Sequence, residues 1–265
     1  MTNQNVKNFY DNEGWQYLGD NSRDAIINEN LTKVAASYVT NVRLRILDNL
    51  GSGDALLDVG CGPIQYPEYV SYSQNFKLRV CVDLSEEALK LAKNKIGKHG
   101  VFIVGDYLHL EAPKEAPFAG ATLINVLYHI EKNKQEELVR KILADLRPGA
   151  NLVIVYSNPR TLSAIVTKFL VSIKHKFIEG IRRKNRETLE NPIYFFRHPI
   201  SFWDNFRDDA FVTTSAWRTF SPALERLLFR EHLFGAHFLK VLFRLEKCKF
   251  WSLISEYTLI VLKKR

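Results

Sequence analysis

Residues 54–63 of the chain read Asp-Ala-Leu-Leu-Asp-Val-Gly-Cys-Gly-Pro, an apolar run that ends in a glycine turn. The run predicts a short buried strand. Gly60 and Gly62 carry no side chain, so a ligand can approach the backbone there. A second apolar run, Leu78–Val82, is followed by Asp83, which stands 21 residues after Gly62. That is about the spacing at which an acidic side chain meets ribose hydroxyls in a doubly wound sheet.

The residues after Gly62 separate two kinds of cofactor. A dinucleotide fingerprint needs a third glycine, but the run here is Gly60-Cys61-Gly62-Pro63-Ile64-Gln65. The third glycine allows the close helix–strand packing on which a bound pyrophosphate depends. Its absence argues against NAD or FAD and favours a cofactor with ribose and adenine but no phosphate.

Strand and helix patterns alternate along the first part of the chain. We expect strands at 55–59, 78–83, 101–105, 119–126 and 151–157, and helices at 22–48, 64–73, 85–97 and 132–146. This alternation predicts an α/β fold with a parallel, doubly wound sheet. Ligands of such sheets bind beyond the carboxyl ends of the strands. Asp58, Asp83, Asp106 and Asn125 all fall at those predicted ends.

Four blocks in this order resemble one family: Leu56–Gly62, Val82–Ser85, Gly105–Tyr107 and Leu146–Ala150. The chain is similar over residues 35–157 to the class I S-adenosylmethionine-dependent methyltransferases of the small-molecule type, with a type 11/25-like domain. The resemblance implies a Rossmann-like sheet, mostly parallel with an antiparallel C-terminal edge strand at 257–263, plus a helical insertion or lid. It implies S-adenosylmethionine as cofactor and S-adenosylhomocysteine as product. Pro63-Ile64 stand where many members have a third small residue, which leaves the loop shape open.

We expect Asp83 to accept hydrogen bonds from both ribose hydroxyls, since Ser85 is the better N-cap for the following helix. By the resemblance, Asp106 accepts from the adenine amino group, and the glycine loop faces the methionine end. Asp58 is expected to organise that loop through backbone hydrogen bonds. The predicted cofactor-binding set is Tyr10, Asp58, Gly60, Cys61, Gly62, Asp83, Leu84, Gly105, Asp106, Tyr107 and Asn125. No metal site is expected.

Methyl transfer from a sulfonium needs alignment of the acceptor and, for a hydroxyl, a base. His129 is the first candidate, because it follows the strand predicted at 119–126; the alternative is a histidine that only packs against the next helix. Tyr128, Tyr194 and His198 are the further catalytic candidates. Tyr194 and His198 belong to a segment that interrupts the strand–helix pattern.

The predicted organisation is an N-terminal helical cap (1–50), a cofactor-binding core (51–157), a helical and aromatic substrate insertion (158–209) and C-terminal strands with a helix that complete the sheet (210–265). The net charge of +8 lies outside the core, because residues 1–157 hold 17 Lys/Arg against 19 Asp/Glu and residues 158–250 hold 17 against 9. That bias indicates either an anionic partner or a solvated face.

The expected partner is a small-molecule acceptor, such as a sugar or natural-product hydroxyl or amine, with an anionic one left open. The alternatives are an RNA or protein methyltransferase, or one that acts on a lipid-linked substrate at a membrane. Nucleic acid is disfavoured because no RNA-binding module is recognisable. Monomer and homodimer stay open. Three cysteines without metal-type spacing and no signal-peptide pattern predict a cytoplasmic protein.

Overall fold

The computed structural model describes residues 17–18, 21–22, 33–161, 194–221, 224–225 and 233–265. Tyr10 and the greater part of the predicted insertion lie outside the described residues, as does the first part of the helix predicted at 22–48. The helix predicted within 210–265 is represented among the described residues by α9, Leu233–Leu245. A two-stranded ribbon pairs β1 (Tyr17–Leu18) with β2 (Asn21–Ser22).

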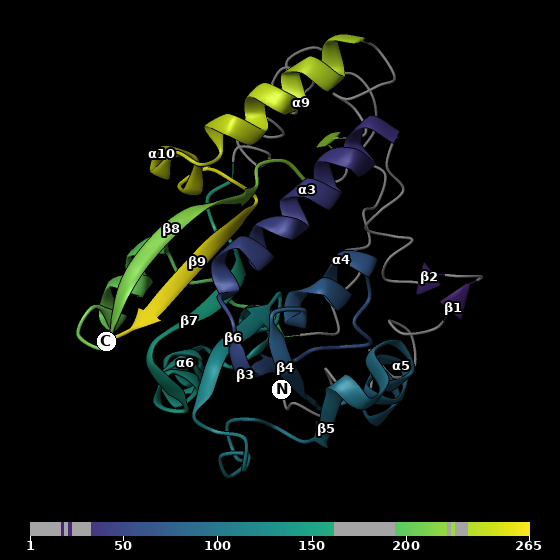
Figure 1. Cartoon of the computed structure of the whole chain (residues 1–265). Helices are drawn as coiled ribbons and strands as arrows, with labels where there is room; N and C mark the ends of the chain where they lie inside the picture. The colour runs from purple at the N-terminus through teal and green to yellow at the C-terminus, as the bar shows by residue number, and fades with distance from the viewer. Residues whose placement is uncertain (1–16, 19–20, 23–32, 162–193, 222–223, 226–232) are drawn as a thin grey trace, which may run out of the picture.

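A seven-stranded sheet of order β5-β4-β3-β6-β7-β9-β8 is the centre of the fold (Figure 1). The strands are β3 (Gly53–Val59), β4 (Phe76–Asp83), β5 (Gly100–Val104), β6 (Phe118–Ile124), β7 (Leu146–Ser157), β8 (Ala210–Arg218) and β9 (Tyr257–Lys264). The first five run parallel to one another. β3 and β6 are buried along most of their length, as strands covered on both faces must be.

The predicted antiparallel pairing of the last strand is confirmed, because β9 runs antiparallel to β7. The strand does not form the edge itself, however. It lies between β7 and β8, and β8 pairs antiparallel with it on the outer side. The sequence run of β9 fits this interior position, since five consecutive residues, 258–262, are buried.

Helices cover both faces of the sheet. They are α3 (Lys33–Leu50), α4 (Pro67–Val70), α5 (Glu86–Ile96), α6 (Gln135–Ala144), α9 and α10 (Lys249–Ser252). α5 begins and ends as predicted: the Ser85 side chain accepts a hydrogen bond from Ala88 N at 3.0 Å, and Gly97 ends the helix with φ +51°.

Two predicted helices are shorter than expected. The helix predicted at 64–73 is only α4 followed by a 3-10 turn, Ser71–Ser73, because Tyr66 is extended before Pro67 at the first helical position. The helix predicted at 132–146 opens with a 3-10 turn, Lys132–Lys134, and its last residue, Leu146, already belongs to β7.

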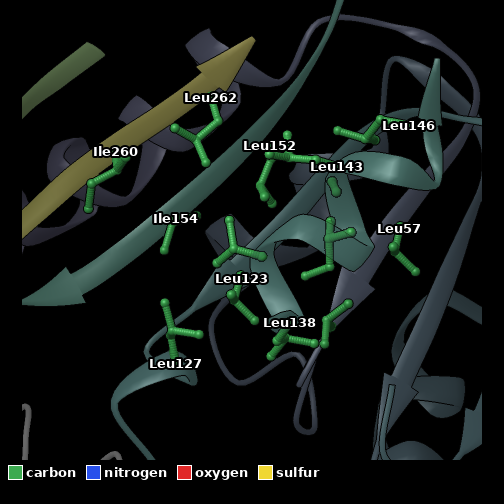
Figure 2. Packing of buried hydrophobic residues seen from close by; sticks show 14 of the residues in the cluster. Leu57, Leu123, Leu127, Leu138, Leu143, Leu146, Leu152, Ile154, Ile260 and Leu262 are labelled. Atoms are coloured by element: carbon green, nitrogen blue, oxygen red, sulfur yellow. The ribbon is translucent and has the colours of Figure 1, made fainter. Parts of the chain in front are cut away.

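Two large hydrophobic clusters, with a small third one around Ile64, fill the space between sheet and helices in the described part of the chain. On one face, Leu138 and Leu143 of α6 pack with sheet residues such as Leu57, Leu123 and Leu152 (Figure 2). The 3-10 segment Ile200–Phe206 adds Phe202, Trp203 and Phe206 to this cluster. On the other face, α3 and α9 pack against residues of β3, β7 and β9. Each fully buried large side chain contributes about 1.5–3 kcal/mol, so both layers hold the strand ends in fixed positions.

Candidate functional site

The glycine loop follows β3 and turns through left-handed backbone. Gly60 has φ +66° and Gly62 has φ +53°. A side chain at Gly60 would overlap the side chain of Val126, which follows β6. Gly60 N also donates to Val82 O at 2.7 Å. The loop is therefore held closely between the ends of β4 and β6, where only glycine fits at position 60.

Ile64 continues the left-handed turns without a glycine. Its φ is +49°, and its side chain is fully buried beside Cys81, Leu89 and Ala92. A β-branched residue with this backbone is strained. The Lys95 ammonium donates to the Ile64 carbonyl at 2.8 Å and helps to fix the turn. A large residue thus stands at position 64, in the stretch where many members of the family have a small one, and its backbone has a positive φ all the same.

Asp83 connects the glycine loop to the start of α5. Its Oδ2 accepts a hydrogen bond from Gly62 N at 2.8 Å, and its Oδ1 accepts one from Ser85 N at 2.9 Å. The side chain is half-buried, as is that of Leu84 beside it. The predicted acidic residue and the predicted loop are therefore in direct contact, and the ribose role stays a prediction.

The role predicted for Asp58 in the glycine loop is not what the structure shows. Its carboxylate is buried, pairs with the Arg79 guanidinium and accepts a hydrogen bond from Thr122 Oγ1 at 2.6 Å. Arg79 Nε donates to Asp58 at 3.0 Å, and Nη1 donates to Tyr69 O at 2.6 Å. Burial lowers the pKa of Arg79, but the charge and hydrogen bond of Asp58, together with Cys81 and Cys61, outweigh burial, so that pKa is raised. Asp58 is therefore a structural anchor under the loop.

The end of β5 brings Asp106 to the same edge. Gly105 N donates to Asp83 O at 2.9 Å, so the two strand ends are neighbours. Asp106 Oδ1 accepts from Leu108 N at 3.0 Å and closes a turn, with His109 Nε2 at 3.7 Å from Oδ2. About a fifth of the Asp106 side chain is exposed (20%).

Tyr107 was included in the predicted cofactor set, but its side chain belongs to the core. The ring is buried, and the hydroxyl donates to Asp145 Oδ2 at 2.6 Å. Burial and this carboxylate raise the pKa of the phenol well above its usual value. Tyr107 therefore stays at the site only through its backbone, which lies within the turn that Leu108 N closes on Asp106 Oδ1.

Asn125 carries the clearest sign of a missing ligand. It follows β6 with φ +59°, and its backbone N–H donates to Val155 O at 3.1 Å. Its side-chain Oδ1 is buried and accepts no hydrogen bond from the described residues. A buried acceptor without a donor is costly, so a bound N–H or O–H group is expected there. Together with the glycine loop and Asp83, this orphaned oxygen fits a cofactor that presents several donors.

The catalytic candidates come from two segments, Tyr128 and His129 shortly after Asn125 in the sequence and Tyr194 and His198 from beyond β7. His129 ends a 3-10 turn, Leu127–His129, and its Nδ1 is 3.1 Å from the carbonyl oxygen of Tyr194. The ring packs between Tyr128 at 4.6 Å and Phe195 at 5.6 Å. Burial lowers the pKa of His129, although the Tyr194 carbonyl works against that shift.

Tyr194 and His198 hold the second segment against the first. The Tyr194 hydroxyl accepts from Lys132 N at 3.1 Å. His198 N donates to the Tyr156 hydroxyl at 2.8 Å, while its ring stacks on Phe202 at 4.1 Å. The His198 ring is thus stacked on the 3-10 segment Ile200–Phe206, whereas the His129 ring packs against Tyr128.

Several contacts were not foreseen from the sequence. The Phe195 ring packs against His129, and Phe196 N donates to Tyr128 O at 2.8 Å, while the Phe196 ring meets His198. The aromatic run at 194–196 was the available signal. Arg79 was visible as a charged residue within an apolar strand, a pattern that indicates a buried partner.

Asp58, Cys61 and Cys81 place their side-chain ligand atoms within 4.8 Å of one another. The Asp58 charge is already neutralised by Arg79. The neighbouring Cys81 and burial raise the pKa of the Cys61 thiol, so the thiolate that a metal needs is disfavoured. The cluster is better explained as packing under the glycine loop.

The comparisons with known proteins agree with this geometry. Residues 57–154 match the family model of a methyltransferase domain. N-methyltransferase NodS from Bradyrhizobium japonicum WM9, solved with S-adenosyl-L-homocysteine, is 12% identical, with 98% of each chain covered and a TM-score of 0.58. Magnesium protoporphyrin IX methyltransferase ChlM from Synechocystis PCC 6803, with bound SAH, is 14% identical, with 99% of this chain and 100% of that chain covered and a TM-score of 0.54.

The small RNA methyltransferase HEN1 also has this fold, at 14% identity and a TM-score of 0.53, with 87% of this chain and 25% of that chain covered. No curated protein sequence matches the chain. The family match covers the strand ends that bring Asp83, Asp106 and Asn125 to one edge of the sheet. Residues 57–154 are therefore identified as a methyltransferase domain, in a chain that has the Rossmann-like fold of S-adenosylmethionine-dependent methyltransferases.

Proposed function

We propose that this methyltransferase acts on a small molecule, at a hydroxyl or amine, and that His129 is the base that takes the acceptor's proton. The observation that carries the proposal is the aromatic wall formed by Tyr128, His129, Tyr194 and Phe195, whose first two members follow Asn125 closely in the sequence. Tyr128, His129, Tyr194 and Phe195 come from two segments of the chain and are joined by the contact between His129 Nδ1 and Tyr194 O at 3.1 Å. A wall of packed rings suits a compact acceptor better than an extended polymer.

The chemistry of His129 follows from its partner. A carbonyl oxygen only accepts hydrogen bonds, so Nδ1 carries the proton and Nε2 holds the lone pair of the neutral ring. Burial lowers its pKa, which keeps the ring neutral and basic near pH 7. When bound, the cofactor supplies an electrophilic methyl group on a sulfonium. His129 Nε2 would accept the proton of the acceptor, and the Tyr194 carbonyl would stabilise the resulting imidazolium.

NodS and ChlM, by their names, act on an amine and on a porphyrin, and HEN1 acts on small RNA. These names support methyl transfer in general but do not choose the acceptor. The runner-up function is RNA or protein methylation. The wall supports this reading less well, because Tyr128 is buried and His129 and Tyr194 are half-buried, so that of these four residues only Phe195, 42% exposed, offers an open ring. Proteins that bind single strands stack successive bases on several aromatic rings.

The test follows labelled methyl from S-adenosylmethionine into three pools: low-mass hydroxyl and amine compounds, RNA, and protein. The proposal predicts label in a low-mass product. Label in RNA or protein alone would contradict it.

His129→Asn keeps an N–H that can reach Tyr194 O but removes the base, and is expected to lower kcat about 10²–10⁴-fold. The exposed His109 gives the matched control, His109→Asn, which should keep its turnover.

A further inference from the structure

The outer side of α9 and the α10 turn exposes large apolar side chains. Val241 and Leu245 lie one helical turn apart and are 41% and 42% exposed, while Phe250 and Leu253 are 64% and 44% exposed. Phe238, one turn before Val241, is exposed as well. We call Val241, Leu245, Phe250 and Leu253 the α9–α10 face. They are four of the nine large apolar side chains that are exposed in the described part of the chain.

These side chains are not the ones that hold α9 in the fold. Leu239 and Leu242 are buried in the cluster that α9 shares with α3. The Phe243 ring meets Tyr38 of α3 edge-on at 6.5 Å and lies 3.9 Å from the Arg45 guanidinium. In Figure 1, α9 runs alongside α3 at the top of the view, and α10 lies beside β8. The apolar character of the outer side is therefore not explained by packing against α3.

The exposed charges on this side have one sign. Lys240, Arg244 and Lys247 are exposed. The acidic residue among them in sequence, Glu246, is fully buried and pairs with Arg45 at 2.8 Å. It also accepts hydrogen bonds from the Thr219 backbone at 3.0 Å and hydroxyl at 2.6 Å. Burying the one carboxylate leaves apolar side chains flanked only by cations.

We propose that the α9–α10 face docks on the surface of an anionic lipid bilayer. Apolar side chains of this kind enter the boundary between headgroups and acyl chains, and flanking Lys and Arg meet the anionic headgroups. No described helix is both long and apolar enough to cross a bilayer, so the contact would be peripheral.

Other occupants fit less well. A second copy of the chain joined through this face would bring cations against cations. A nucleic acid would use the cations but would leave Val241, Leu245 and Leu253 in water. The proposal goes beyond the proposed function and does not rest on it, because docking on lipid needs no particular methyl acceptor.

The test is flotation of the full chain with vesicles of phosphatidylcholine alone and of phosphatidylcholine mixed with phosphatidylglycerol. The wild type is expected to float with the mixed vesicles and to be released by added salt. Each cation contributes about fivefold to binding, so Lys240→Glu/Arg244→Glu should lower the affinity more than tenfold. Leu245→Ser/Phe250→Ser should also weaken binding, while Phe211→Ser, on β8 and 56% exposed in the wild type, should not.

Binding of S-adenosylhomocysteine by calorimetry checks that each variant is folded, because the face is separate from the glycine loop. The proposal is overturned if the wild type ignores the anionic vesicles, or if all variants bind them equally. It is also overturned if the wild type ignores vesicles but forms a dimer that Leu245→Ser/Phe250→Ser breaks, since the face would then join two copies.

Discussion

The strained turn at Ile64 gives a prediction whose sign can be worked out from the structure. Its left-handed backbone costs a non-glycine residue about 1–2 kcal/mol. Its fully buried side chain offsets that cost, because removing such a side chain to alanine loses about 2–5 kcal/mol. Both Ile64→Ala and Ile64→Gly should therefore destabilise the protein.

The order of the two variants is the informative result. Alanine keeps the backbone strain, whereas glycine releases it, and alanine at such positions is less stable than glycine by about 1 kcal/mol. We expect Ile64→Gly to be the more stable of the two in urea denaturation. At Leu89, which is buried in the same cluster on helix α5, the usual order should hold, with alanine about 1 kcal/mol better than glycine. If Ile64→Ala proves the more stable variant while Leu89 behaves normally, the strain argument is wrong.

Three other perturbations test the site. Asp58→Asn leaves the Arg79 guanidinium buried without its charge partner and should lower the free energy of unfolding by about 3–5 kcal/mol in the same assay; a loss under about 1 kcal/mol would contradict the anchor role. Gly60→Ala would force a methyl group into Val126 at φ +66° and should abolish cofactor binding in calorimetry, so normal affinity would refute the close fit of the loop. Because burial lowers the pKa of His129, the native state resists protonation of this ring. Stability and turnover should therefore be full above about pH 6.5 and fall below it. If the turnover of His129→Asn falls at low pH in the same way as that of the wild type, this histidine is not the cause.

Local patterns were enough to predict the order of strands and helices. The apolar runs before Asp83 and Asn125 predicted where β4 and β6 end, to within two residues. Ser85 predicted the start of α5. Each of these signals lies within a few residues of the strand or helix end that it marks. The same signals brought the glycine loop and Asp83 to one edge of the sheet, where Gly62 N now donates to Asp83 Oδ2.

Contacts set by three-dimensional packing were not predictable in the same way. Asp58 pairs with Arg79 because of the register in which β3 lies beside β4, which no local pattern states. Tyr194 contacts His129 although 65 positions separate them in the sequence, and no local pattern predicts a contact over that separation. Tyr107 was assigned from its neighbour Asp106, but the side chains of adjacent residues can point to different layers, and this one reaches Asp145.

Calorimetry with S-adenosylhomocysteine on the wild type and on Asp83→Ala tests the central claim most directly. If Asp83 binds the ribose, the variant loses two charge-assisted hydrogen bonds as well as the tie to Gly62, and affinity should fall about 100-fold or more. Asp54→Ala is the control and should bind like the wild type. Asp54 lies on the same sheet but is exposed, and among the described residues its ion pair is with Lys77. Equal affinity of Asp83→Ala and wild type would contradict the assignment of this strand edge as the cofactor site.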